Sequence, residues 1–224
     1  MDIVLAHSGV TDAGEWDGVA PLLAREHRVV TVDLWQEGSL RQILLAAIPR
    51  ERAALVGTSF GGRGTLEAAS AAPERVEALC LIGTNPFGWS EDVRAIGEQE
   101  TALFDAGRLD EAAQLMVTAW LVGPSRREED VPRELRDRVF AMQRRAYGLH
   151  QAESGPFDVD AIAAPMLYVR GELDWPDVAS AAERFQAAEQ HVVQDAAHLA
   201  TMERPDVVAA IVLEFLAQTS RRQA

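Results

Sequence analysis

One serine, Ser59, lies between two glycines in residues 57–61, which have the pattern G-x-S-x-G. An apolar run at residues 53–56 precedes this turn, and a helix-forming segment at residues 65–69 follows it. The pattern predicts a strand, a sharp turn and a helix, with the serine hydroxyl directed away from the sheet. Such a turn strains the backbone at the serine and requires small residues on both sides. Ser59 is therefore a candidate nucleophile.

A serine hydroxyl is a weak nucleophile at neutral pH and needs a base that takes its proton, together with an acid that orients the base. His198 and Asp174 follow the last two predicted strands of the chain, at residues 191–193 and 166–170. We predict that His198 is the base and Asp174 the orienting acid. Asp177 is a rival acid, but it lies where a helix is expected to begin, and a carboxylate there is usually a cap.

Two phosphate-binding alternatives have weaker support. Gly57 and Gly62 have the spacing G-x-x-x-x-G, but Arg63 and Gly64 follow, where a phosphate loop needs lysine and serine or threonine. No G-x-G-x-x-G follows a predicted strand, which argues against a dinucleotide site. The backbone N–H of Phe60, which is predicted to open the helix after the turn, is instead expected to donate to an oxyanion.

The elements that position these residues alternate between strands and helices, which predicts an α/β fold with a mostly parallel sheet of about six strands and helices on both faces. Strands are predicted at residues 3–6, 29–33, 53–56, 76–82, 166–170 and 191–193, and helices at residues 16–26, 39–48, 178–188 and 205–217. The strands at residues 3–6 and 29–33 are expected to be buried. Carboxyl ends of parallel strands share one edge of a sheet, so the three candidate residues are expected to meet there. Residues 219–224 are expected to form a frayed tail.

The alternation stops between residues 86 and 155, where no strand is indicated. Helices are predicted at residues 92–106, 109–121 and 132–150, with Gly107 and Gly123 as breaks. We interpret residues 86–155 as a small helical cap inserted over the strand ends. Residues 1–85 and 156–224 then form the core.

The sequence resembles the α/β-hydrolase superfamily over nearly its whole length. The resemblance is carried by His7-Ser8-Gly9 with Trp16, the strand end Val32-Asp33, the turn at Ser59, residues 171–174, and Ala197-His198 followed by residues 203–205. It implies a catalytic triad in the order Ser59, Asp174, His198, and an oxyanion hole formed by Phe60 and Gly9, with Ser8 as an alternative to Gly9. The family usually has His-Gly where this chain has His7-Ser8, and usually begins with two further antiparallel strands.

Aromatic residues follow several predicted strands and are expected to line a substrate pocket. They are Trp35, Phe87, Trp89 and Trp175. Trp120, Met142 and Tyr147 are further candidates from the helical insertion. Such a wall favours an uncharged or weakly polar acyl substrate. Arg63 is the nearest cation and is expected to be held in an ion pair.

Composition limits the class of partner. The chain has 224 residues, 48% hydrophobic residues and a net charge of −14, which argues against binding to nucleic acid or an anionic membrane surface. It has one cysteine and no H-E-x-x-H motif, so neither a disulfide framework nor a metal site is expected. The first apolar run is too short for a signal peptide, and a cytoplasmic location is the default expectation. No cofactor is expected, and the sequence indicates no oligomeric state.

These observations predict a serine hydrolase that cleaves a carboxylic ester or lactone through an acyl-enzyme intermediate. Three alternatives keep the triad and change the reaction: a C–C bond hydrolase, an acyltransferase or a peptidase. A fourth is a non-catalytic protein that binds a small molecule on the same scaffold, because fold alone does not define function.

Overall fold

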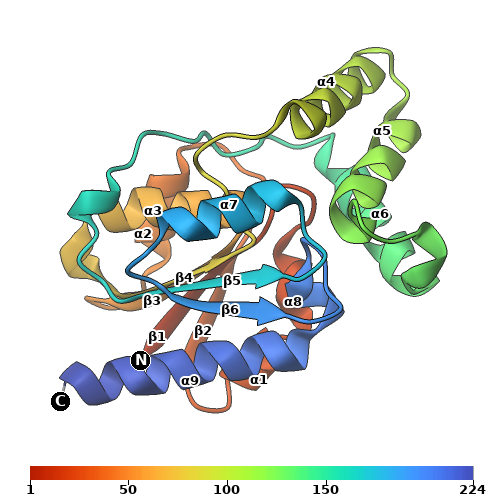
Figure 1. Ribbon diagram of the computed structural model, residues 1–224. Helices are drawn as coiled ribbons and strands as arrows, with labels where there is room; N and C mark the ends of the chain where they lie inside the picture. The colour runs from red at the N-terminus through yellow and green to blue at the C-terminus, as the bar shows by residue number, and fades with distance from the viewer. Residues whose placement is uncertain (224) are drawn as a thin grey trace.

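The computed structural model describes residues 1–223 and has six parallel strands in one sheet, in the order β2-β1-β3-β4-β5-β6 (Figure 1). The strands are β1 (Asp2–Ala6), β2 (Arg28–Val32), β3 (Ala53–Thr58), β4 (Val76–Ile82), β5 (Met166–Gly171) and β6 (Glu189–Val193). The predicted fold class is confirmed. Strand order reverses between β1 and β3, so the loops that follow these two strands flank a crevice at the carboxyl edge.

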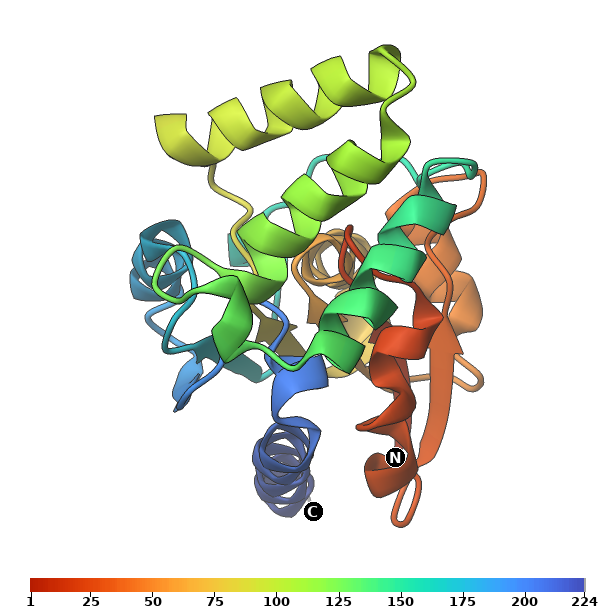
Figure 2. The same ribbon diagram turned by 90° about the vertical axis from the view of Figure 1, so that its right-hand side faces the viewer.

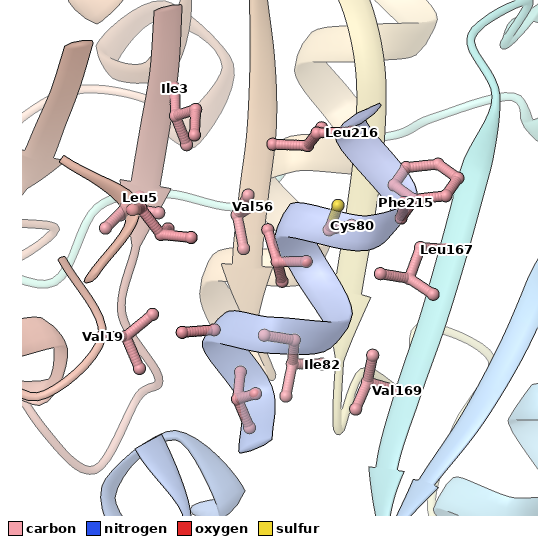
Figure 3. Close-up of a cluster of buried hydrophobic side chains, with 14 of the residues drawn as sticks. Ile3, Leu5, Val19, Val56, Cys80, Ile82, Leu167, Val169, Phe215 and Leu216 are labelled. Carbon is pink, nitrogen blue, oxygen red and sulfur yellow. The ribbon is translucent and has the colours of Figure 1, made fainter. Parts of the chain in front are cut away.

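Helices cover both faces of the sheet, because side chains of each strand alternate between two apolar clusters. One cluster packs the sheet against α1 (Ala20–Leu23) and α9 (Pro205–Gln223), and Figure 3 shows part of it around Cys80 and Phe215. The other packs against α2 (Leu40–Ala47), α3 (Phe60–Ala71) and α7 (Pro176–Arg184). This double coverage explains why the inner strands are almost entirely buried.

Three expectations about elements are wrong. The helix predicted at residues 16–26 is two short helices, η1 (Ala13–Asp17) and α1, because Gly18 ends the first one against Pro205. The second strand was expected to be buried, but β2 is a partly exposed edge strand. Instead of a frayed tail from residue 219, α9 continues to Gln223, while Ala224 lies outside the described residues.

Between β4 and β5 the described chain forms helices without a strand. They are α4 (Glu91–Asp105), α5 (Leu109–Met116), the π-helix η3 (Val117–Val122), the 3-10 helix η4 (Glu128–Asp130), α6 (Arg133–Ala146) and the 3-10 helix η5 (Val159–Ala161). Figure 2 shows α4 and α5 above the sheet, whereas α6 runs beside the first short helices of the chain. In residues 1–223 no helix is long and apolar enough to cross a membrane.

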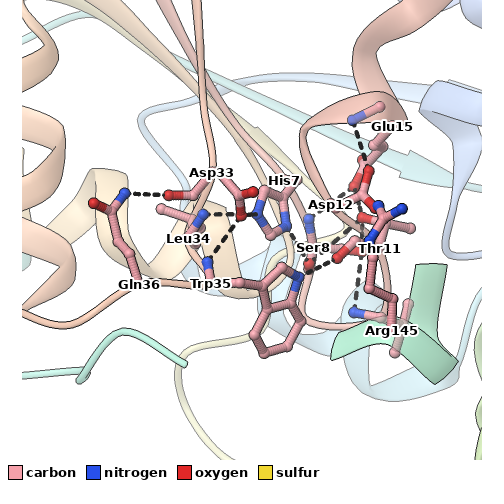
Figure 4. A network of polar contacts seen from close by, with 12 residues as sticks. His7, Ser8, Thr11, Asp12, Glu15, Asp33, Leu34, Trp35, Gln36 and Arg145 are labelled. Carbon is pink, nitrogen blue, oxygen red and sulfur yellow. Dashed lines mark hydrogen bonds and ion pairs between the residues drawn. The ribbon is translucent and has the colours of Figure 1, made fainter. Parts of the chain in front are cut away.

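Arginine side chains tie these helices to the rest of the chain. On α6, Arg138 donates to the Gly14 carbonyl at 2.5 Å and lies 2.8 Å from the Asp17 carboxylate. About two turns further along the same helix, Arg145 pairs with Asp12 (Figure 4). The loop after β1 is therefore held between the sheet and α6.

Candidate active site

Ser59 occupies the sharp turn between β3 and α3 with backbone angles φ 51° and ψ −110°. Residues other than glycine rarely adopt a positive φ, so the backbone at Ser59 is strained and needs support from its surroundings. The Ser59 N–H donates to the Ile82 carbonyl at 2.8 Å. A Cβ atom at Gly57 would lie 2.5 Å from the backbone of Gly61, so the close approach of β3 and α3 requires glycine at position 57.

Asp174 and His198 form a buried pair after β5 and before α8 (Ala200–Glu203). The His198 Nδ1 atom lies 3.0 Å from both carboxylate oxygens of Asp174, and each side chain is 2% exposed. This contact places the imidazole hydrogen on Nδ1 and leaves Nε2 with a lone pair that can accept a proton. The rival acid Asp177 is used elsewhere: it accepts hydrogen bonds from the backbone and hydroxyl of Ser90.

Ser59 and His198 line the same cavity, which has a volume of about 450 Å³. The hydrogen bonds of residues 1–223 include none between the Ser59 hydroxyl and the imidazole. Of the residues predicted for the oxyanion hole and the pocket wall, Gly9, Trp35, Phe60 and Trp89 line this cavity as well.

Two of the expected pocket residues lie elsewhere, which corrects the prediction. Phe87 lines a separate hollow, where its ring packs against Phe185 and under the Arg184 guanidinium. Trp175 turns away from the cavity, and its indole N–H donates to the Ala119 carbonyl at 2.9 Å. Position after a strand did not determine the direction of these side chains.

The helices between β4 and β5 complete the cavity wall. Trp120 and Tyr147, named as candidates, line it, whereas Met142 does not. Sequence reasoning missed the polar residues Glu100 and Gln143. Both lie on long polar helices, and no local pattern marks which polar positions face inward.

The loop after β1 is organised by the buried carboxylate of Glu15 (Figure 4). The Ser8 N–H donates to Glu15 Oε2 at 2.7 Å, and the Thr11 hydroxyl donates to the same oxygen at 2.5 Å. Because the Ser8 amide is engaged in this way, Gly9 is the remaining candidate in this loop for an oxyanion donor. A Cβ atom at Gly9 would contact the Phe60 Cβ atom at 3.4 Å, so the two candidate donors are neighbours.

The His7 side chain hydrogen-bonds to backbone groups and does not line the cavity. The Leu34 N–H donates to His7 Nε2 at 2.8 Å, so this nitrogen carries no hydrogen. The Nδ1 hydrogen is then donated to the Ser8 carbonyl at 2.7 Å. The neutral ring therefore joins the ends of β1 and β2 and is not available as a second base.

The π-helix η3 brings Trp120 against His198. The two ring centroids are 4.5 Å apart, and Trp120 also packs edge to face with Trp89 at 5.3 Å. The carbonyls at the end of η3 accept hydrogen bonds from Arg126, which pairs with Glu203 at 2.6 Å. Glu203 in turn accepts the Ala197 N–H at 2.8 Å, directly before His198.

Charged groups near the cavity do not form a metal site. Residues 1–223 contain no group of three or more His, Cys, Asp or Glu side chains that could hold a metal ion. Arg63 lines the cavity and, as expected, is paired: its Nε atom lies 3.2 Å from Glu67, whose side chain is 1% exposed.

Comparison with known proteins identifies the class. The family described as the alpha/beta hydrolase fold matches residues 35–120. A pimeloyl-[acyl-carrier protein] methyl ester esterase from Nitrosomonas europaea is 32% identical over 95 residues, a match that spans only 38% of either chain. A protein of the same name from Aeromonas hydrophila subsp. hydrophila is 24% identical over 245 residues, covering 96% of this chain and 95% of the relative.

Solved structures agree with this assignment. A hydrolase from Pseudomonas aeruginosa is 26% identical, with a TM-score of 0.75 over 96% of this chain and 89% of the other. A thermophilic esterase from Thermogutta terrifontis is 21% identical, with a TM-score of 0.76 over 98% and 90% of the two chains, and shows the shared fold. The chain has the α/β-hydrolase fold. It is an enzyme of that fold, and its relatives include esterases.

Proposed function

We propose that the protein is a carboxylic ester hydrolase that forms an acyl-enzyme on Ser59. The observation that carries the proposal is that a serine on a strained turn lines one cavity with a histidine that is paired with a buried carboxylate. Six aromatic side chains line that cavity, which suits an apolar acyl chain. The methyl ester in the names of two relatives supports a small alcohol as the leaving group.

In the first half of the reaction the Ser59 Oγ atom attacks the ester carbonyl carbon while His198 Nε2 takes the hydroxyl proton. Asp174 holds the ring and stabilises the imidazolium. The tetrahedral intermediate collapses, the bond to the alcohol oxygen breaks, and His198 gives its proton to the leaving alcohol. Water then attacks the acyl-enzyme with His198 as base, and the acid is released with Ser59 restored. A lactone would follow the same steps, with the alcohol remaining attached to the acid.

The oxyanion of both intermediates would be bound by the N–H groups of Phe60 and Gly9. The Phe60 amide lies in the first turn of α3, where N–H groups have no partner within the helix. Gly9 lies beside it in the loop that Glu15 holds. In this proposal residues 86–155 form the cap over a core of residues 1–85 and 156–224, and the small acyl substrate binds between them.

The test is hydrolysis of p-nitrophenyl acetate, butyrate and hexanoate by the wild type and by Ser59→Ala, His198→Ala and Asp174→Asn. We expect kcat/KM to fall about 1,000-fold or more for Ser59→Ala and His198→Ala, because these groups act as a unit. A fluorophosphonate should label the wild type at Ser59 and should not label the Ser59→Ala variant. Activity of a folded Ser59→Ala variant within a few-fold of the wild type would contradict the proposal.

A folded wild type that neither hydrolyses esters nor reacts with the fluorophosphonate would instead favour a non-catalytic binding protein. The same assay extended to β-diketones, acyl acceptors and short peptides separates ester hydrolysis from the other reactions of this fold.

A further inference from the structure

A polar cluster lies in the part of the cavity wall that comes from α4 and α6. Glu100 on α4 accepts two hydrogen bonds at its Oε1 atom, from Gln143 Nε2 at 3.1 Å and from the Tyr147 hydroxyl at 2.8 Å. All three side chains line the cavity that also holds Ser59 and His198. Gln143 is 3% exposed, so the Glu100 carboxylate is held by a buried hydrogen-bond donor.

The surroundings of Glu100 are otherwise mostly aromatic and apolar. The neighbouring wall is formed by Trp89, Phe104, Met116 and Trp120. In residues 1–223 no arginine, lysine or histidine forms an ion pair with Glu100, and no donor to its Oε2 atom is found. A carboxylate in such a place is costly unless it is paired, and burial raises the pKa of Glu100 accordingly.

We propose that Glu100, held by Gln143 and Tyr147, binds a hydroxyl or ammonium group at the end of the substrate distant from the scissile carbonyl. Both groups donate hydrogen bonds to a carboxylate, and the ammonium also neutralises its charge. Glu100 is thus a specificity-determining residue. The inference rests on the proposed function in treating the occupant of the cavity as the substrate.

Arg63 is the other charged group in the wall and would favour the opposite kind of substrate. Its guanidinium is already committed, to Glu67 at 3.2 Å and to the Gly155 carbonyl at 2.9 Å. A substrate with a free carboxylate would gain little from this paired cation and would be repelled by Glu100. Whether a cationic or an anionic substrate binds more tightly therefore tests whether Glu100 or Arg63 determines substrate specificity.

The experiment measures binding in the background of Ser59→Ala, so that its outcome does not depend on turnover. Trp35, Trp89 and Trp120 line the cavity, so tryptophan fluorescence reports occupancy. The probes are methyl hexanoate, methyl 6-hydroxyhexanoate, methyl 6-aminohexanoate and monomethyl adipate, which have a methyl, hydroxyl, ammonium or carboxylate terminus. We expect the ammonium and hydroxyl probes to bind about 10-fold more tightly than methyl hexanoate, and the carboxylate probe most weakly.

Adding Glu100→Gln should reduce the preference for ammonium over methyl by about 10-fold. Adding Tyr147→Phe should reduce it less, because the carboxylate remains. The matched control is Glu91→Gln, which removes one charge from an exposed position of the same helix and should change nothing. Circular dichroism and Tm verify folding, and Glu100→Met, which also removes the carboxylate, replaces Glu100→Gln if the latter is unfolded.

Tightest binding of monomethyl adipate, or an unchanged order of preference in Glu100→Gln, would overturn the inference. Failure of the proposed function has a different signature: the wild type would not hydrolyse any of the four esters, whatever their order of binding.

Discussion

Glu15 is a buried acid whose contacts reach both ends of the chain. Its side chain is enclosed by donors: the Ser8 N–H and Thr11 hydroxyl at Oε2, and the Thr201 hydroxyl at Oε1 at 2.7 Å. Thr201 lies three residues after His198. The carboxylate therefore fixes the loop of the proposed oxyanion donor relative to the loop of the proposed base, and we consider it a positioning residue.

Replacing Glu15 with glutamine should lower kcat for p-nitrophenyl acetate by about 10- to 100-fold, with KM changed by less than about threefold. The amide can accept at one atom only, so one of its present donors loses its partner, and the Gly9 loop shifts relative to the reacting carbonyl. Steady-state kinetics separate the two parameters. Glu26→Gln, at an exposed position, is the control. A lower Tm with unchanged kcat would show that Glu15 only stabilises the fold.

Among single residues, the sequence predicts those candidate site residues that belong to a recognisable local pattern. Gly57 and Ser59 stand in a motif with one steric purpose, and Asp174 and His198 follow strands that end at the same edge. Glu15 and Glu100 were not predicted, because their partners are set by packing: the hydroxyl of Thr201 that binds Glu15 is 186 positions away.

The π-helix η3 links the helices between β4 and β5 to the candidate active site. The Ala119 carbonyl of η3 accepts a hydrogen bond from the Trp175 indole N–H, and the carbonyls of its last two residues accept hydrogen bonds from Arg126. The prediction placed one helix at residues 109–121, where the structure has α5 followed by η3. The contact between the Trp175 indole and the Ala119 carbonyl joins positions 56 residues apart, so local sequence could not predict it. π-turns occur frequently at functional sites, and here the turn presents Trp120 to His198.

Trp120→Ala should lower kcat for p-nitrophenyl acetate by about 10-fold, because the imidazole loses the aromatic face that limits its orientation. Trp120→Phe, which retains such a face, should recover most of that loss. The acetyl group is small, so its binding depends little on the rest of the cavity. Initial rates at saturating ester measure the effect.

Phe104→Ala is the control for this prediction, since Phe104 lines the same cavity and packs on Tyr147 rather than on His198. It should enlarge the cavity without the loss of kcat. Equal losses in Trp120→Ala and Phe104→Ala would mean that cavity shape, and not contact with the imidazole, is responsible.

At the scale of the whole molecule, arginines join two parts of an acidic chain. The net charge is −14, yet Arg126, Arg138 and Arg145 each bind a carboxylate that lies outside residues 86–155. The alternation of elements predicted the parallel sheet and the inserted helices. It did not predict how the inserted helices pack on the sheet, because their contacts are side-chain pairs across long separations. The pocket residues were consequently the weakest part of the prediction.

Arg126 is the most buried of these arginines, and its removal gives a test of the whole arrangement. The side chains of Arg126 and Glu203 are 11% and 6% exposed. Arg126→Met should cost about 3 kcal/mol in the free energy of unfolding at pH 8, since it leaves a buried carboxylate without its partner. Arg138→Met should cost less than about 1 kcal/mol, because its partner Asp17 is exposed. Urea denaturation measures both without screening charge.

The penalty for Arg126→Met should also depend on pH. Burial already raises the pKa of Glu203, and Arg126 opposes that shift, so the variant raises the pKa further. The native state then binds a proton more readily than the unfolded state, whose carboxyl titrates near 4.5. Stability of the variant relative to the wild type should therefore rise as the pH is lowered from 8 toward 4.5, and change no further from this group below that value. The double variant with Glu203→Gln should lose this dependence, whereas a penalty that is constant across the range would show that Glu203 is not the group left unpaired.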